Sequence, residues 1–312
     1  MHRTGLAALV MAFACMLPVS PAAALSNHTA VSGLGNDTNP CTVAQPCRTM
    51  QMAYSNTAVG GEIDVLDPTG YGALVITHAI SIEGHGWASM NATATGSAIT
   101  INAGPNDAIS LHGLILDGLG IGQSGIVANS CRSFELGDSI VRNFTGGGIA
   151  INMTSSFCVT SIVNTSVTDN KGTGVSIKTG AGSGGTVTAT LDRVLFKNNG
   201  ANGFTADASA GGGIRATISD STFNFNAAIG VSAIGGSSGV FIALVRDVIS
   251  NHPIGAKADA SAGVASLIFQ SCVVHTSSTL HLQSVGNGFL ISFGGNVLFD
   301  GAGTFNVTQS PT

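Results

Sequence analysis

The amino-acid sequence predicts an all-β chain built from one short unit repeated many times, and three observations lead to this prediction. Glycine accounts for 43 of the 312 residues and charged residues for only 9%, whereas ordinary proteins have about 7% glycine and about 25% charged residues. The chain is nevertheless 44% hydrophobic, so disorder is excluded for most of it. Glycine at this frequency disfavours helix interiors, and a sequence motif recurs at intervals of 24 to 28 residues.

The repeated motif is a run of four residues that starts with apolar side chains and ends with a polar one. Its eight copies end at Asp117, Asn143, Asn170, Asn198, Asn226, Asn251, Thr276 and Asp300. A glycine and an alternating strand follow most copies, and a third short strand precedes them, so each unit holds three strands of period two. Three strands per repeat, wound in one direction, predict a parallel β-helix, and the usual hand of parallel crossovers makes it right-handed.

Two parts of the sequence resemble a known superfamily. The repeat over residues 60–308 resembles the right-handed parallel β-helix superfamily that includes pectate lyases and polygalacturonases. The segment from Gly35 to Arg48 resembles the start of secreted bacterial β-helix proteins of unassigned activity. The repeat predicts a solenoid of roughly 8–10 coils, and the resemblance says little about chemistry because one fold can carry many functions.

The first 24 residues are predicted to be a signal peptide. Arg3 gives a basic start, residues 6–17 are largely apolar, and the alanines at 22–24 offer a small-residue cleavage site before Leu25. The apolar run is shorter than the roughly 20 residues of a transmembrane anchor. We therefore expect a secreted, periplasmic or cell-surface protein without a membrane span. The expected division is a signal peptide over 1–24, an N-terminal cap over 25–60 and a β-helix domain over 61–312.

A short amphipathic helix is predicted over residues 46–57, where Pro46 leads into Met50, Met52, Ala53 and Tyr54. The first coil of a solenoid exposes its apolar end, and such a helix would cap it. The strands that follow are expected at 63–65, 74–76, 80–82 and 99–101.

The cysteines test the register of the repeat. Cys131 and Cys158 lie 27 residues apart, as do the motif copies beside them, so they should occupy one column on adjacent coils. Stacked positions lie about 4.8 Å apart, within the Cα range that a disulfide tolerates. Cys41 and Cys47 are predicted to close a small loop beside the cap, and Cys272 to remain a buried free thiol.

The asparagines that end the motif suggest a polar ladder. Asn143, Asn170, Asn198, Asn226 and Asn251 are expected to share one turn column, with Asp117 and Asp300 at its ends. Such a ladder is usually structural, because the amides bond along the stack and to the turn backbone.

One charged constellation is a candidate active site. Asp192 and Asp220 each precede their motif end by six residues, and Arg193 and Arg246 precede theirs by five. If the two carboxylates share a column, they lie about 5 Å apart, so that repulsion raises one pKa or a Ca²⁺ ion sits between them. Retaining glycosidases use carboxyl pairs at this separation. The competing interpretation is a solvated turn face with weak Arg–Asp pairs.

Other features limit the partners. The formal charge of −5 argues against nucleic acid and anionic lipid, whereas sugars or proteins remain. The Gly84-His85-Gly86 run is similar to a polygalacturonase motif, but the motifs that accompany it there are absent, so a turn is favoured. Aromatic platforms for sugars are scarce, since Trp87 is the single tryptophan.

Two functions follow from the sequence. The first is an exported, non-catalytic β-helix scaffold that contacts glycans or proteins and needs no cofactor. The alternative is a polysaccharide lyase or glycoside hydrolase that acts on an acidic polysaccharide through the Asp192, Arg193, Asp220 and Arg246 face, with Ca²⁺ as its only conceivable cofactor.

Overall fold

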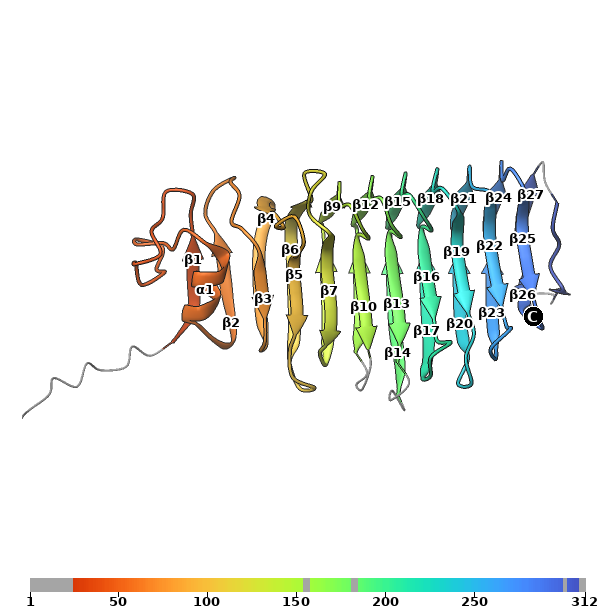
Figure 1. Ribbon diagram of the computed structural model, residues 1–312, viewed down its shortest axis with the longest axis horizontal. Helices are drawn as coiled ribbons and strands as arrows, with labels where there is room; N and C mark the ends of the chain where they lie inside the picture. The colour runs from red at the N-terminus through yellow and green to blue at the C-terminus, as the bar shows by residue number, and fades with distance from the viewer. Residues whose placement is uncertain (1–24, 154–157, 181–184, 300–301, 309–312) are drawn as a thin grey trace, which may run out of the picture.

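The computed structural model describes residues 25–153, 158–180, 185–299 and 302–308, and the predicted signal peptide lies outside these ranges. The described chain is an elongated solenoid whose coils stack along one axis (Figure 1). It contains a 19-stranded sheet and a nine-stranded sheet, and neighbouring strands within both run parallel. The predicted all-β class and parallel β-helix solenoid are confirmed.

The larger sheet takes up to two strands from each coil. The first strands are β1 (Ser26–Val31), β2 (Thr57–Val65), β4 (Ile80–Met90), β6 (Ala108–Asp117), β8 (Ser133–Gly137), β11 (Val159–Val163), β14 (Thr186–Asp192), β17 (Gly213–Ser219), β20 (Val240–Val245), β23 (Ala265–Gln270), β26 (Phe289–Ser292) and β28 (Val307–Thr308). The second strands are β9 (Ile140–Arg142), β12 (Ser166–Thr168), β15 (Leu195–Lys197), β18 (Thr222–Asn224), β21 (Val248–Ser250), β24 (Val273–His275) and β27 (Val297–Phe299).

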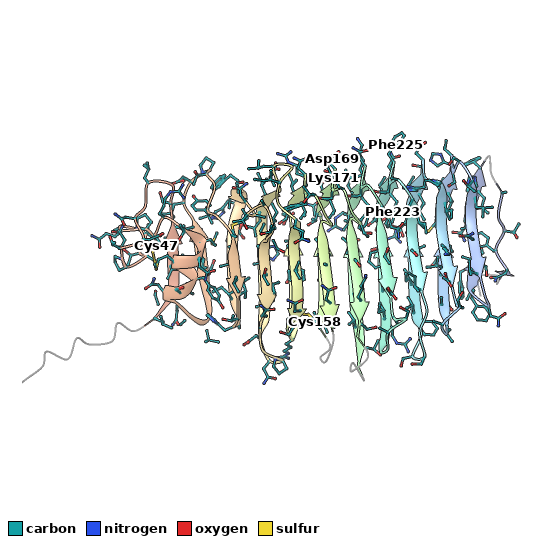
Figure 2. The ribbon with its side chains drawn as sticks, in the orientation of Figure 1. Cys47, Cys158, Asp169, Lys171, Phe223 and Phe225 are labelled. Carbon is teal, nitrogen blue, oxygen red and sulfur yellow. A yellow bond between two sulfur atoms is a disulfide. The ribbon has the colours of Figure 1, made fainter. Side chains whose placement is uncertain are left out.

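The smaller sheet takes the remaining strand of each coil. Its strands are β3 (Leu74–Ile76), β5 (Ser97–Asn102), β7 (Ser124–Ser130), β10 (Ile149–Met153), β13 (Val175–Thr179), β16 (Phe204–Asp207), β19 (Ile229–Ile234), β22 (Ile254–Asp259) and β25 (Leu280–Val285). Alternate residues of each strand point inward, and the buried Ile, Val, Leu, Ala and Phe side chains form one continuous core. Phe196 and Phe223, for example, stack with ring centroids 4.4 Å apart (Phe223 is labelled in Figure 2).

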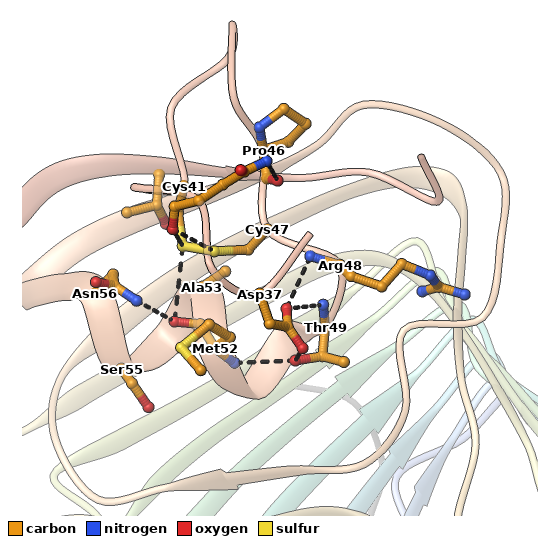
Figure 3. The surroundings of a disulfide bond; sticks show 12 residues. Asp37, Cys41, Pro46, Cys47, Arg48, Thr49, Met52, Ala53, Ser55 and Asn56 are labelled. Carbon is orange, nitrogen blue, oxygen red and sulfur yellow. Dashed lines mark hydrogen bonds between the residues drawn. A yellow bond between two sulfur atoms is a disulfide. The ribbon is translucent and has the colours of Figure 1, made fainter. Parts of the chain in front are cut away.

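The N-terminal end is closed by a short helix and a disulfide. Helix α1 (Met50–Asn56) begins four residues later than the start of the predicted range, because the Thr49 side chain caps it by accepting from the backbone N–H of Met52. The Asp37 carboxylate fixes this start by accepting from the backbone N–H groups of Arg48 and Thr49 (Figure 3). Strand β1, which the sequence analysis did not predict, pairs with β2 beneath the cap.

Both predicted disulfides are confirmed, as is the buried free thiol of Cys272. The Cys41–Cys47 bond closes the loop over α1 (Figure 3), and the Cys131–Cys158 bond joins adjacent coils with its Cα atoms 5.4 Å apart. Disulfides persist in oxidising compartments, so the two bonds are consistent with an extracellular protein. Among the described residues, no helix is both long and apolar enough to cross a membrane.

The predicted asparagine ladder is wrong in detail, because its five asparagines fall into two columns, while Asp117 is aligned with Arg142 and Asp300 lies outside the described residues. Asn143, Asn198 and Asn251 have left-handed backbones on the outer edge of the turn, and they share that edge with Asp169 and Phe225 (Figure 2). The buried column comes one residue later in each coil. The amide side chains of Asn170, Asn199 and Asn226 are hydrogen-bonded in sequence, and the backbone N–H of Asn226 continues the series by donating to Nδ1 of His252. The asparagines that end the motif copies therefore include both outward and inward positions.

Candidate functional site

The four predicted site residues lie at the corner between the two strands that each coil gives to the larger sheet. We call Asp192, Arg193, Asp220 and Arg246 the Arg/Asp corner. Its last three residues have left-handed backbones, with φ values of 52°, 50° and 59°. They point outward at the same position of three successive coils, because the strands on either side are in register.

The structure corrects the predicted pairing of the two carboxylates. Asp192 is aligned with Ser219, so Asp220 comes one position later and lies between Arg193 and Arg246. The error has the same origin as that in the asparagine ladder. Asp192 lies six residues before the outward Asn198, whereas Asp220 lies six residues before the inward Asn226, so equal spacing does not give equal register here.

Each carboxylate of the Arg/Asp corner has a cationic partner. Arg246 donates from Nε to Oδ1 of Asp220 at 2.7 Å, and its second nitrogen contacts Oδ2. These bonds hold the pKa of Asp220 below its usual range. The predicted pair of carboxylates would instead have raised the pKa of one of its two members. Asp192 pairs with Arg193 and accepts from the Ser219 hydroxyl at 2.8 Å. Because the pKa of Asp220 is lowered, its carboxylate is a poor source of the proton that a general acid supplies.

Asp247, which follows the Arg/Asp corner, is fully buried and serves the backbone. Its two oxygens accept from the backbone N–H groups of Ser221 at 2.8 Å and Val245 at 3.0 Å, and burial raises the pKa of its carboxyl to about 8. Side-chain oxygens at the same inward position of other coils also accept from a backbone N–H of the preceding coil, namely those of Ser139, Thr165, Ser221 and Asn296. Asp247 is therefore part of a structural column.

A second corner, near the N-terminal end, departs from the regular pattern. Strand β4 pairs with β6 in two stretches, and between them residues 84–87 lie opposite the single residue Gly113. His85 and Gly86 both have left-handed backbones. The two chains approach closely here, because a Cβ atom on Gly113 would lie 2.6 Å from the backbone nitrogen of His85. The corner is thus widened by three residues relative to the strand it pairs with.

The widened corner presents an aromatic and polar surface. His85 Nε2 lies 2.6 Å from Oδ1 of Asp64, and Oε1 of Glu83 accepts from the His85 backbone N–H at 2.9 Å. The imidazole of His85 lies beside the indole of Trp87, with ring centroids 5.2 Å apart, and Trp87 is 43% exposed. We call Asp64, Glu83, His85 and Trp87 the Trp87 corner.

Sequence reasoning identified only the turn at the Trp87 corner. The usable signal was the position of the single tryptophan directly after a Gly-His-Gly run. Throughout the described ranges there is no enclosed pocket and no group of three or more His, Cys, Asp or Glu side chains placed to hold a metal ion. Both corners are exposed features of the solenoid flank.

Comparison with known proteins identifies the fold. No protein-family model and no curated protein sequence matches this chain. Among solved structures, it is similar to pectate lyase Pel9A, with 12% identity and a TM-score of 0.58 over 90% of this chain and 79% of that one. It is also similar to an alginate lyase from Paenibacillus sp. str. FPU-7, with 12% identity and a TM-score of 0.55 over 91% of this chain and 98% of that one. The A-module of the mannuronan C-5 epimerase AlgE4 from Azotobacter vinelandii gives 13% identity and a TM-score of 0.51, over 80% and 86% of the two chains.

These likenesses define the class of protein. The chain has the pectate-lyase-like parallel β-helix fold, as the sequence repeat predicted. Identities of 12% and 13% establish the architecture, and the chemistry has to be argued from the side chains of this chain.

Proposed function

We propose that this protein is an exported scaffold that contacts a glycan along its flank without cleaving it. The observation that carries the proposal is a row of outward hydroxyls on the larger sheet. Ser161, Thr190 and Thr217 are in register on β11, β14 and β17, and Thr188 lies on the same face. Successive members are spaced by the distance between strands, about 4.8 Å, so they form a regular hydrogen-bonding surface for a polyhydroxylated chain.

Two further facts support this function. The similar structures carry the names of enzymes that act on pectate, alginate and mannuronan, which makes a polysaccharide the first partner to test. The Arg/Asp corner balances its own charges through the Asp220–Arg246 and Asp192–Arg193 pairs, as expected for a stable surface. Export is supported by the signal-peptide pattern of residues 1–24 and by the two disulfides.

The alternative function is a polysaccharide lyase or glycoside hydrolase that uses the Arg/Asp corner. One observation favours it, because the Arg193 and Arg246 side chains are 58% and 57% exposed and can reach a sugar acid. The alternative requires that a substrate carboxylate displace Asp220 from Arg246, or that Ca²⁺ join the site.

The experiment that separates the two functions is a glycan panel assayed for both binding and turnover. The protein without residues 1–24 is incubated with neutral and uronate-containing polysaccharides, with and without Ca²⁺. We expect saturable binding to at least one glycan and no shortened product by chromatography. Product that disappears in the Asp192→Asn, Asp220→Asn double variant would establish the enzyme instead. Absence of both binding and product would leave contact with proteins.

A further inference from the structure

We propose that the Trp87 corner is a binding subsite for a neutral glycan, with the indole of Trp87 as the stacking platform. This inference rests on the proposed glycan contact and adds the place and the chemical class of the ligand. The first observation behind it is that residues 84–87 interrupt the pairing of β4 with β6.

The inserted residues place Trp87 where a ligand can reach it. A β-bulge re-aims side chains, and insertions in repeat proteins gather on the face that binds partners. Without the insertion, Trp87 would occupy a regular position of the coil, stacked between the equivalent residues of the two neighbouring coils. With it, Trp87 is 43% exposed and its indole is flanked by the imidazole of His85, 5.2 Å away between centroids. An exposed, supported indole offers a flat apolar face and one N–H donor, which suits the C–H face and the hydroxyls of a pyranose.

The polar groups of the Trp87 corner suit sugar hydroxyls. His85 engages one oxygen of the Asp64 carboxylate, and an ionised carboxylate has about four acceptor positions. Glu83 accepts from the His85 backbone and keeps a partly exposed side chain, as does Asp64. Both carboxylates can therefore accept hydrogen bonds from hydroxyls of a sugar stacked on the indole, while His85 keeps Asp64 and Trp87 in place.

The charge of the surrounding face selects against sugar acids. Glu62 and Glu135 lie on the same outer face as Asp64 and Glu83, and strands β2, β4, β6 and β8 contain no Lys or Arg. A uronate carboxylate would approach several like charges, which is unfavourable at short range even near a protein surface. The ligand class is therefore a neutral pyranose chain, in contrast to the acidic polysaccharides expected for the Arg/Asp corner.

The single tryptophan gives a direct test. Trp87 fluorescence of the protein without residues 1–24 is titrated with gluco-, xylo- and manno-oligosaccharides, and in parallel with uronate and glucosamine oligomers. We expect a saturable change in intensity or wavelength with a neutral oligosaccharide and none with the uronate oligomers, which the acidic face repels. The glucosamine oligomers carry the charge that this face attracts, so they test whether the ligand is neutral or cationic. By calorimetry, Trp87→Ala should weaken binding by about tenfold or more, as for an aromatic hot spot.

Two matched variants make the result specific. Phe225→Ala removes another exposed aromatic side chain, from a distant coil, and should leave the affinity unchanged. Trp87→Phe keeps a smaller platform and should bind more tightly than Trp87→Ala. Glycan binding on the panel with unchanged Trp87 fluorescence and unaltered affinity in Trp87→Ala would overturn the subsite and leave the proposed function standing. Preference for uronate or glucosamine oligomers would overturn the ligand class, and absence of all glycan binding would overturn both proposals.

Discussion

The Arg/Asp corner and the Trp87 corner occupy the same turn of the solenoid but use their side chains in opposite ways. In the regular coils, Asp220 faces Arg193 and Arg246, so its charge is paired within the stack. In the widened coil, residues 84–87 have only Gly113 opposite them, so Trp87 is left with an exposed ring.

The difference follows from the geometry of stacking. In a parallel β-helix each position meets the same position of the coils before and after it, about 4.8 Å away. An exposed polar residue in that array therefore tends to be satisfied by its neighbours. A break in the register frees side chains from this constraint, and such breaks are where binding residues should be sought in solenoids with smooth flanks.

The largest expected effect is a loss of stability on substitution of Asp247, compared with a small loss on substitution of Trp87. Asp247→Ala removes the acceptors of two backbone N–H groups, that of Ser221, which is buried, and that of Val245, which is partly buried. We expect it to lower the free energy of unfolding by about 3 kcal/mol, whereas Trp87→Ala should lower it by less than about 1 kcal/mol. Denaturant unfolding followed by circular dichroism measures both. Equal losses in the two variants would refute the division between the structural column that contains Asp247 and the exposed Trp87 corner.

A smaller effect is a dependence of stability on pH that comes from Asp247. Its pKa is raised to about 8 by burial, against about 3.9 in the unfolded chain, so the folded state holds the extra proton between these values. Stability should therefore fall as the pH rises through this interval and level off above about 8, with a slope of at most about 1.4 kcal/mol per pH unit.

The control for this prediction is Asp247→Asn, which cannot titrate and should show a flatter profile. His252 is also buried and its pKa is lowered, so it contributes the opposite slope, but only at or below the ordinary histidine value of 6.5. The comparison is therefore made between pH 7 and about 8. Parallel profiles for the two proteins in that range would mean that Asp247 is already ionised in the folded state.

The fold could be predicted because the sequence repeats it. The period of 24 to 28 residues and the alternation within each strand define the coils, and the 27-residue separation of Cys131 and Cys158 fixes the register where the bond forms. Strand β1 could not be predicted from the repeat because it precedes the repeat, and it pairs with β2 and with the cap segment at Cys47.

The candidate site was harder to predict because it depends on single-residue register. Runs such as Asp169-Asn170 and Asn198-Asn199 contain two polar residues, and nothing in the run says which one turns inward. That ambiguity moved Asp220 by one position and created a carboxyl pair that the structure does not contain. The Trp87 corner falls where the repeat is irregular, so the periodicity that revealed the coils carried no information about it.

The smallest expected effect on stability comes from breaking the ion pair between Asp220 and Arg246. Both side chains extend into solvent, where ion pairs are screened by salt and contribute little. Asp220→Asn and Arg246→Gln should therefore leave the unfolding midpoint unchanged at high salt and leave affinity for neutral glycans at the wild-type level. The matched variant Asp64→Asn, which alters a partly exposed carboxylate at the Trp87 corner, should weaken glycan binding while leaving stability unchanged. If Asp220→Asn weakens binding and Asp64→Asn does not, the ligand lies on the Arg/Asp corner, and the regular part of the solenoid is the functional one.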